Sequence, residues 1–312
     1  LQLCFAVLLF LGIDDLPVIV AFTLLTGSLR ALHQPVRVSY AYDIVGSGQV
    51  VSGLGLLNLS GRSGQLVGAL LVGLVMKHYG APAALTVIAM GHAIAFLAFA
   101  RLRSAGKAAV KDHAPIGQNL REYAAELRTN GILTMLVLIT AAVEVFGFSF
   151  ATALPELATA RLNLGEDGLG YLHAARAAGG IVAGLAMSFM GQMQRRGLAY
   201  LFVIFAFGAS ILLLSVEGAL LFTVCAVALV ALLATTSDVL TQSMMQLSVA
   251  NELRGRAMGV WVLAVGIAPI GHLQFGALSV VIGLSNTLAV NGAILVVVGL
   301  VVALVAPRLR QL

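Results

Sequence analysis

Long apolar stretches recur along the whole chain, and each is long enough to cross the hydrocarbon core of a bilayer. A helix of about 20 apolar residues spans a core of about 30 Å. Nine complete stretches meet this criterion, at 16–36, 49–76, 81–101, 131–155, 168–190, 198–215, 218–247, 257–283 and 287–306, and residues 1–11 form a partial stretch, the tail of an earlier one. We therefore expect an all-α polytopic membrane protein, because a helix satisfies its own backbone hydrogen bonds in lipid.

The composition excludes a soluble protein. Of the 312 residues, 60% are hydrophobic and only 10% are charged, which leaves too little charge to cover a water-exposed surface. Cys4 and Cys225 lie in separate apolar stretches, and no cluster of His and Cys has the spacing of metal ligands. We therefore expect no disulfide framework, no metal, no cofactor and no enzyme active site.

The loops between the stretches differ in charge in an alternating way. One side carries thirteen basic residues: Arg37, Arg101, Arg103, Lys107, Lys111, Arg121, Arg128, Arg195, Arg196, Arg254, Arg256, Arg308 and Arg310. The other side carries only Lys77 and Arg161. Basic loops stay in the cytoplasm. We therefore expect a multi-pass protein of the cell (inner) membrane with a cytoplasmic C-terminus. The net charge of +5 is then explained by topology, and we expect no nucleic-acid partner.

One polar segment divides the chain. Residues 102–130 form a predicted cytoplasmic linker, in which Leu120, Tyr123 and Leu127 share one face of a short amphipathic helix. Residues 1–101 then form a partial N-terminal bundle, and 131–312 form a complete six-helix bundle. Because many transporters consist of two equal repeats, we expect that about two and a half helices are missing from the N-terminal half.

Ionisable residues inside the predicted spans are the strongest functional signal, because a charge at the bilayer centre costs at least about 2.5 kcal/mol. They are Arg62, Glu144, His173, Arg176, Asp238 and His272. A rise of 1.5 Å per residue places Arg62 and Glu144 roughly 20 Å from the cytoplasmic starts of their spans and Arg176 roughly 12 Å from the outer face. The same count places Asp238 near the cytoplasmic interface, roughly 30 Å from its outer start.

Glu144 and Arg176 lie in consecutive antiparallel spans, so a buried pair between them is geometrically permitted. Such a pair is either a proton-coupling site, with Arg62 as a competing partner, or a static ion pair that orients two helices. His173 shares a face with Arg176 at a spacing of three residues, and it is either a cavity residue or a hydrogen-bonded packing residue.

A polar stripe runs along the span 218–247, where Thr235, Asp238, Gln242 and Gln246 recur on one helical face. The stripe lines either water or a partner helix, and we favour a cavity wall to which His272 also contributes. Met244 and Met245 beside the stripe can adapt to varied ligands, or they are ordinary core.

Glycines recur on one face of two spans. Gly61, Gly64 and Gly68 share a face in the first of them, and Gly180 and Gly184 do so in the second. Small residues at this spacing allow the backbones of two helices to approach closely. Close helix packing is the interpretation that we favour over contact with a ligand.

Three segments carry a resemblance to the major facilitator superfamily. Asn-Glu-Leu-Arg-Gly-Arg-Ala-Met-Gly at 251–259 resembles the turn before the eleventh helix of exporters similar to the enterobactin and macrolide efflux proteins. Gly-Gln-Met-Gln-Arg-Arg-Gly at 191–197 is similar to the cytoplasmic loop signature of the family without its aspartate. Gly-Arg-Ser-Gly-Gln-Leu-Val-Gly at 61–68 is similar to the antiporter glycine motif of helix five, with Gln65 in place of proline.

The resemblance covers the chain as part of helix three to helix twelve, and it implies a transporter that works by alternating access. It implies proton-driven efflux of a small amphipathic molecule, such as a drug or a siderophore, by a monomer whose partners are substrate, protons and the lipid bilayer. The motifs imply a cytoplasmic gate at Gly191, Arg195, Arg196, Glu252, Arg254 and Arg256. Import of a small solute and a transport-dead membrane receptor or scaffold are the alternatives.

Overall fold

The structure is a computed structural model that describes residues 1–13, 15–101, 125–190, 195–249, 253–305 and 309. All regular secondary structure in these residues is helical, which confirms the prediction of an all-α protein. Seven helical stretches among them are long and apolar enough to cross a membrane: His78–Ala100, Gly131–Arg161, Gly168–Phe189, Arg196–Ser215, Leu220–Leu247, Ala257–Ile282 and Leu284–Val305.

The first 101 residues fold into α1 (Gln2–Phe10), α2 (Leu16–Val45) and α3 (Val50–Ala100). The predicted spans 49–76 and 81–101 form the two arms of α3, which bends sharply at Gly80, where φ is 80° and ψ is 177°. Only glycine adopts this backbone conformation without strain. The predicted end of the first full span at 36 was wrong, because α2 continues past Arg37 to Val45. A 30-residue helix is about 45 Å long, so its polar end extends beyond the hydrocarbon core.

The span predicted at 131–155 continues to Arg161 and is irregular. It consists of α5 (Gly131–Ala142), the π-helical turn η1 (Val143–Gly147), the 3-10 segment η2 (Phe148–Ala153), the short α6 (Leu154–Glu156) and a second π-helical turn, η3 (Leu157–Arg161). Wide π turns inside helices are rare and frequently occur at functional sites. The irregularity therefore directs attention to the residues that η1 carries.

The remaining helices match the predicted spans closely. They are α7 (Gly165–Phe189), α8 (Arg196–Ser215), α9 (Leu220–Leu247), α10 (Arg254–Val265), α11 (Ala268–Ile282) and α12 (Leu284–Val305). The predicted span 257–283 is divided into α10 and α11 by a short break near Gly266. Lipid imposes a minimum helix length on every crossing segment, and this is why apolar length alone predicts these boundaries well.

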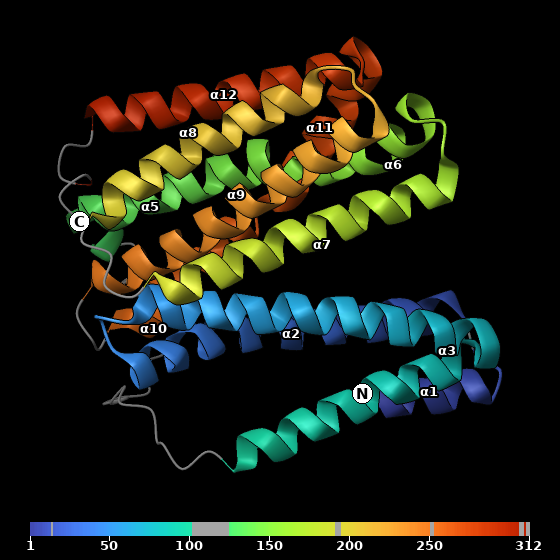
Figure 1. The fold of residues 1–312 in the computed structure, drawn as a ribbon. Helices are drawn as coiled ribbons and strands as arrows, with labels where there is room; N and C mark the ends of the chain where they lie inside the picture. Colours follow the sequence, from blue (N-terminus) through green and yellow to red (C-terminus); the bar gives the residue numbers. More distant parts are fainter. Residues whose placement is uncertain (14, 102–124, 191–194, 250–252, 306–308, 310–312) are drawn as a thin grey trace.

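The helices form two groups, and Figure 1 shows α1–α3 in one group and α5–α12 in the other. We call them the first and the second bundle. Tyr200 and Phe207 of α8 are fully buried in the second bundle. Gly208 allows α8 to approach α12 closely, because a Cβ at this position would lie 2.6 Å from the backbone nitrogen of Val296. The second bundle is thus held together by small residues at helix contacts, as expected in lipid.

Five of the described arginines lie at one end of the molecule, which we call the arginine-rich end. There α3 and α12 end and α5, α8 and α10 begin (Figure 1). Its arginines are Arg101, Arg128, Arg195, Arg196 and Arg254. The opposite end carries the bend of α3 and the turns that lead into α7, α9 and α12 (Figure 1). The loops therefore alternate between the two ends in the order that the charge pattern predicted.

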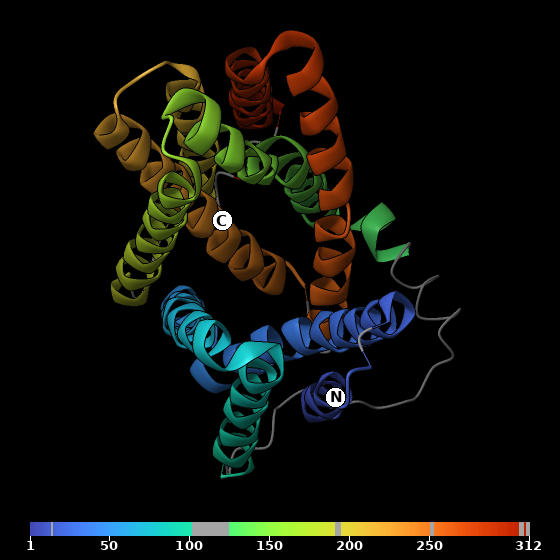
Figure 2. The ribbon, with the colours of Figure 1, turned by 90° about the vertical axis from the view of Figure 1, so that its right-hand side faces the viewer.

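The two bundles are in contact near the arginine-rich end and separate towards the opposite end. A Cβ on Gly55 of α3 would lie 2.6 Å from the Ser188 backbone of α7, and one on Gly184 would lie 2.8 Å from the Leu59 backbone. Towards the opposite end, α7 and the first arm of α3 diverge (Figure 1). Viewed along the bundle, the two groups of helices remain distinct (Figure 2). The backbone contact between α3 and α7 therefore lies towards the arginine-rich end.

Candidate functional site

Glu144 lies on the π-helical turn η1, in the interior of the second bundle. Its side chain is buried, with 8% of its surface exposed, and its electrostatic neighbour is the carboxylate of Asp238 on α9. α11 packs closely on the same turn, since a Cβ on Gly271 would lie 2.7 Å from Cα of Val145. Two acidic side chains from different helices are thus electrostatic neighbours inside the second bundle.

Asp238 interacts with both bundles. The guanidinium of Arg62 on α3 attracts it, and the side chain of Gln242, one turn farther along α9, faces it. Asp238 is thus near enough to Glu144 and Arg62 to interact with both, and its predicted depth near the cytoplasmic interface stays a prediction.

Arg62 is the direct polar connection between α3 and α9. Its NH2 group donates a hydrogen bond of 3.4 Å to Oγ1 of Thr235. Gly180 of α7 leaves room for this side chain, since a Cβ there would lie 3.1 Å from Nε of Arg62. A larger side chain at position 180 would crowd Arg62, so Gly180 allows α7 to pack against this arginine.

Arg176 does not form the ion pair with Glu144 that the sequence permitted. No salt bridge joins these two described residues, and the guanidinium of Arg176 instead lies 5.8 Å from the centre of the Phe150 ring on η2. Its electrostatic neighbour is Arg62, which repels it. The candidate coupling residues thus form a series in the order Glu144, Asp238, Arg62 and Arg176. The two carboxylates come first and the two arginines follow, so Asp238 and Arg62 are the neighbours of opposite charge.

The polar stripe of α9 is buried in the protein. Thr235 and Gln242 are each 1% exposed, and Gln246 is fully buried. On the same helix, Thr241 donates a hydrogen bond of 2.8 Å to the hydroxyl of Tyr200 on α8. The stripe therefore packs against neighbouring helices in this conformation, which is the alternative to the open cavity wall that we favoured.

Some polar atoms of the stripe nevertheless have no partner in the described part of the chain. They are Oε1 of Gln242, both side-chain polar atoms of Gln246 and Oγ of Ser243. Buried polar groups in native proteins are almost always hydrogen-bonded to protein or to water. These amides are therefore available to water or to a ligand, next to the fully buried side chains of Met244 and Met245.

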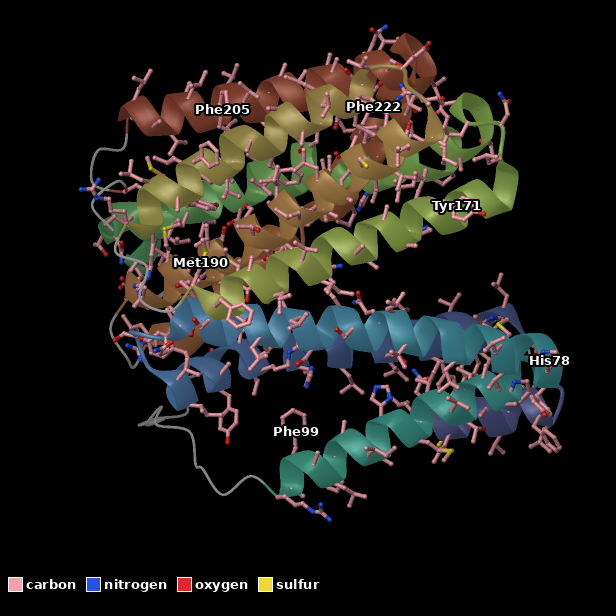
Figure 3. All side chains as sticks on the ribbon, in the orientation of Figure 1. His78, Phe99, Tyr171, Met190, Phe205 and Phe222 are labelled. Carbon is pink, nitrogen blue, oxygen red and sulfur yellow. The ribbon has the colours of Figure 1, made fainter. Side chains whose placement is uncertain are left out.

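The two candidate histidines lie away from the charged series. His173 is exposed on α7, in the part of the helix that diverges from α3, near Tyr171 in Figure 3. His272 on α11 is exposed, and its Nδ1 lies 2.9 Å from Oγ1 of Thr152. Within the described residues, no three side chains of His, Cys, Asp or Glu gather to hold a metal ion.

At the arginine-rich end, two arginines of the predicted gate bridge the bundles. The guanidinium of Arg254, at the start of α10, lies 3.7 Å from the centre of the Tyr42 ring on α2, and its Nε donates to the backbone carbonyl of Gln246. The NH2 group of Arg196, at the start of α8, donates to the carbonyl of Ser47. Arg195 is exposed beside it. These contacts join the two halves of the chain.

Several predicted elements lie wholly or partly outside the described residues. Gly191 and Glu252 are among them, as are residues 102–124 of the predicted linker helix, and of Arg256 only the backbone is described. Sequence reasoning missed Tyr42 and Phe150 as partners of the arginines. Phe150 lies in an apolar span and Tyr42 between two predicted spans, and neither position identifies the ring as the partner of an arginine.

Comparison with known proteins agrees with this architecture. The sequence model of the Major Facilitator Superfamily matches residues 1–268. A crystal structure of a variant of the E. coli fucose:proton symporter, FucP, has a similar fold, with a TM-score of 0.68, 11% sequence identity, and coverage of 86% of this chain and 72% of that chain. No curated protein sequence matches the chain. At this identity, the likeness to FucP concerns the fold alone.

The helical architecture, the two bundles and the buried charges between them are those of a membrane transporter. The family's sequence model covers most of the chain, and the fold similarity extends over most of its length. The chain therefore belongs to the Major Facilitator Superfamily, a family of secondary transporters.

Proposed function

We propose that the protein exports small amphipathic molecules across the cell (inner) membrane, driven by protons that move in the opposite direction. The observation that carries this proposal is the charged series across the two bundles, in which Arg62 of α3 contacts α9 next to Asp238, and Asp238 interacts with the buried Glu144. Charges are expensive in a membrane and are usually retained for a function. A series that spans both moving halves is the arrangement that coupling requires.

Alternating access is supported by the unequal contact between the bundles. α3 and α7 are in backbone contact at Gly55 and Gly184, and the two helices diverge towards the opposite end (Figure 1). α10 packs on α2, whereas α11 packs on η1, η2 and α12 within the second bundle. In the proposed topology, the arginine-rich end is cytoplasmic, so this conformation is open to the outside.

Coupling follows from the repulsion between Glu144 and Asp238. Protonation of Glu144 removes this repulsion, so that Asp238 interacts with Arg62 alone. The charge state of Glu144 thereby changes how strongly Asp238 attracts the arginine of the first bundle. A buried carboxylate readily takes up a proton when its negative neighbour is close. In the proposed cycle, a proton enters from the open outer side, and its release to the cytoplasm accompanies the opposite conformation.

The cytoplasmic gate consists of Arg254 with Tyr42 and of Arg196 with Ser47. An arginine over an aromatic ring contributes about 0.5–2 kcal/mol, which is small enough to break in each cycle. Opening of the arginine-rich end separates both pairs. The contacts of the gate can therefore form and break in each cycle, and they hold this end closed while the outer end is open.

The proposed substrate class follows from the side chains at the closed end of the cavity. The amides of Gln242 and Gln246 have unpartnered polar atoms, and Met244 and Met245 lie beside them on α9. Methionine adapts its shape to different apolar ligands, and the amides orient a ligand through hydrogen bonds. A molecule with an apolar body and a few polar groups fits this combination, and a monomer suffices to bind it.

Transport in vesicles tests the proposal. The purified protein is reconstituted in vesicles that contain a fluorescent amphipathic dye, and a pH gradient of either sign is imposed. The proposal predicts that dye moves uphill against the direction of proton flow. Dye movement in the same direction as the protons would identify an importer, and no gradient-dependent movement of any amphipathic probe would favour a receptor or scaffold.

A further inference from the structure

An apolar groove runs along the contact between the two bundles at the arginine-rich end. Its volume is about 580 Å³, and it is lined by Val45, Gln49, Ser52, Gly53, Leu56, Leu59, Leu185, Ser188 and Phe189. The lining comes from α2, α3 and the end of α7, so both bundles contribute. Leu56 is 56% exposed and Phe189 is 81% exposed. The groove is therefore an open depression on the surface that faces the membrane.

The polarity of the groove changes along its length. Gln49 lies at the start of α3 and Ser188 near the end of α7, so the polar lining lies at the arginine-rich end. Leu56 and Leu59 lie six and nine residues after Val50, which places them about 9–14 Å deeper in the bilayer. A polar mouth at the interface and an apolar interior towards the midplane match the orientation of a phospholipid.

Two arginines stand at the mouth of the groove. Arg196 donates to the carbonyl of Ser47, two residues before Gln49, and its side chain is half-buried there. Arg195 is exposed next to it. No described carboxylate forms a salt bridge with either side chain. The two arginines therefore carry positive charge that no described carboxylate neutralises. An anionic headgroup supplies the negative charge that pairs with them.

We propose that this groove binds one anionic phospholipid of the bilayer leaflet at the arginine-rich end, with its headgroup at Arg195 and Arg196 and an acyl chain over Leu56 and Leu185. The site is distinct from the central cavity, because it lies on the membrane side of the contact between α3 and α7.

Lipid in this groove contacts both bundles at once. The backbones of α3 and α7 are closest at Gly55 and Gly184, directly beside the lining residues Leu56 and Leu185. Separation of the two helices at this end would widen or remove the groove. A ligand that binds one conformation better than the other shifts the equilibrium towards it. The anionic lipid is therefore expected to stabilise the conformation that is closed at the arginine-rich end.

Quenching of tryptophan fluorescence by brominated lipids tests this site. The single tryptophan, Trp261, is replaced by phenylalanine; its indole nitrogen has no hydrogen-bond partner among the described residues, so no described bond is lost. Leu56→Trp places a probe in the groove. Leu300→Trp on α12 is the matched control, because Leu300 is 49% exposed and lies five residues from the same end of its helix. The protein is reconstituted in phosphatidylcholine with a small fraction of brominated phosphatidylglycerol or brominated phosphatidylcholine.

The expected result is several-fold stronger quenching of Leu56→Trp by brominated phosphatidylglycerol than by brominated phosphatidylcholine, with equal quenching of Leu300→Trp by the two lipids. Arg195→Gln together with Arg196→Gln should abolish the preference, and in the protein with both arginines high salt should weaken it. Equal quenching of Leu56→Trp by both lipids would mean that the groove holds bulk lipid only and would overturn the proposal. Absence of quenching at Leu56→Trp alone would mean that another molecule fills the groove, with the same consequence.

Discussion

Arg62 of α3 donates a hydrogen bond of 3.4 Å to Thr235 of α9, and through this contact a cation of the first bundle lies against the second bundle one turn from Asp238. Asp238 in turn interacts with Glu144 on the π-helical turn. A rocking motion of the bundles must change the distance between Arg62 and Asp238, because the two residues belong to different halves. In the proposed mechanism, the charge of Glu144 and the position of the bundles are linked through this distance.

Replacement of Arg62 by glutamine should uncouple transport from the pH gradient. The variant removes the cation that attracts Asp238 and leaves the repulsion between the two carboxylates without compensation, so gradient-driven dye flux should fall at least about tenfold, equivalent to about 1.4 kcal/mol. Arg101→Gln, at the exposed end of α3, is the matched control and should transport normally. Unchanged flux in Arg62→Gln would exclude this arginine from coupling.

Enlargement of Gly55 should open the arginine-rich end. In Gly55→Val the new side chain would meet the backbone of Ser188 at 2.6 Å, and a backbone atom cannot move aside as a flexible side chain can. Spin labels on α2 and α8 should therefore report a longer distance across this end. Gly64→Val is the control on the same helix, because no atom lies within 4 Å of a Cβ there, and its distance distribution should remain that of the unmodified protein.

If Gly55→Val leaves the labelled distance unchanged while Gly64→Val lengthens it, the bundles make contact at a different level from the one described. That result would also remove the basis for the closed cytoplasmic gate at Arg254 and Tyr42.

Arg161 should be important for stability at the end opposite to the gate. Its guanidinium donates to the carbonyls of Leu214, Ser215 and Val216 at the end of α8 and to the hydroxyl of Ser285 on α12. Arg161→Ala leaves these helix-end carbonyls without a donor, and hydrogen bonds to a charged group contribute about 1.5–3 kcal/mol. The melting temperature in lipid nanodiscs should drop by several degrees, whereas Ser285→Ala should lower it only slightly. Equal melting temperatures for both variants would refute this role.

The direction of the chain in the membrane is tested by labelling of single cysteines in intact cells. The native cysteines, Cys4 and Cys225, are both exposed and are first replaced by serine. Glu217→Cys should react with an impermeant maleimide, and Arg195→Cys should react only after the cells are permeabilised, because basic loops remain in the cytoplasm. The reverse pattern would place the C-terminus outside.

Sequence patterns predicted the helices well and their internal geometry poorly. The limits of α7, α8 and α9 follow from apolar length, since lipid requires a continuous crossing helix. The turn that carries Glu144 could not be predicted, because a π turn adds one residue per turn and changes which side chains share a face. Counting at 3.6 residues per turn therefore fails beyond Val143.

Partners across the two bundles were only partly predictable. The sequence indicated that Glu144, Arg176 and Arg62 lie at similar depth, and the structure places all three in one series with Asp238. It does not pair Glu144 with Arg176, whose guanidinium instead lies 5.8 Å from the centre of the Phe150 ring. Likewise, the motif that contains Arg254 indicated a gate, but the Tyr42 ring that completes it comes from a helix more than 200 residues earlier in the chain.

The central claim is that Glu144 couples proton movement to transport, and one comparison tests it most directly. Gradient-driven dye flux, dye exchange without a gradient and melting temperature are measured on the same purified Glu144→Gln protein, with Glu156→Gln, an exposed carboxylate variant of the same span, as the control. Glutamine keeps the volume of the side chain and removes its titration. We predict that Glu144→Gln loses uphill flux and retains exchange and stability, whereas Glu156→Gln retains all three. Normal uphill flux in Glu144→Gln, with or without a lowered melting temperature, would contradict the account.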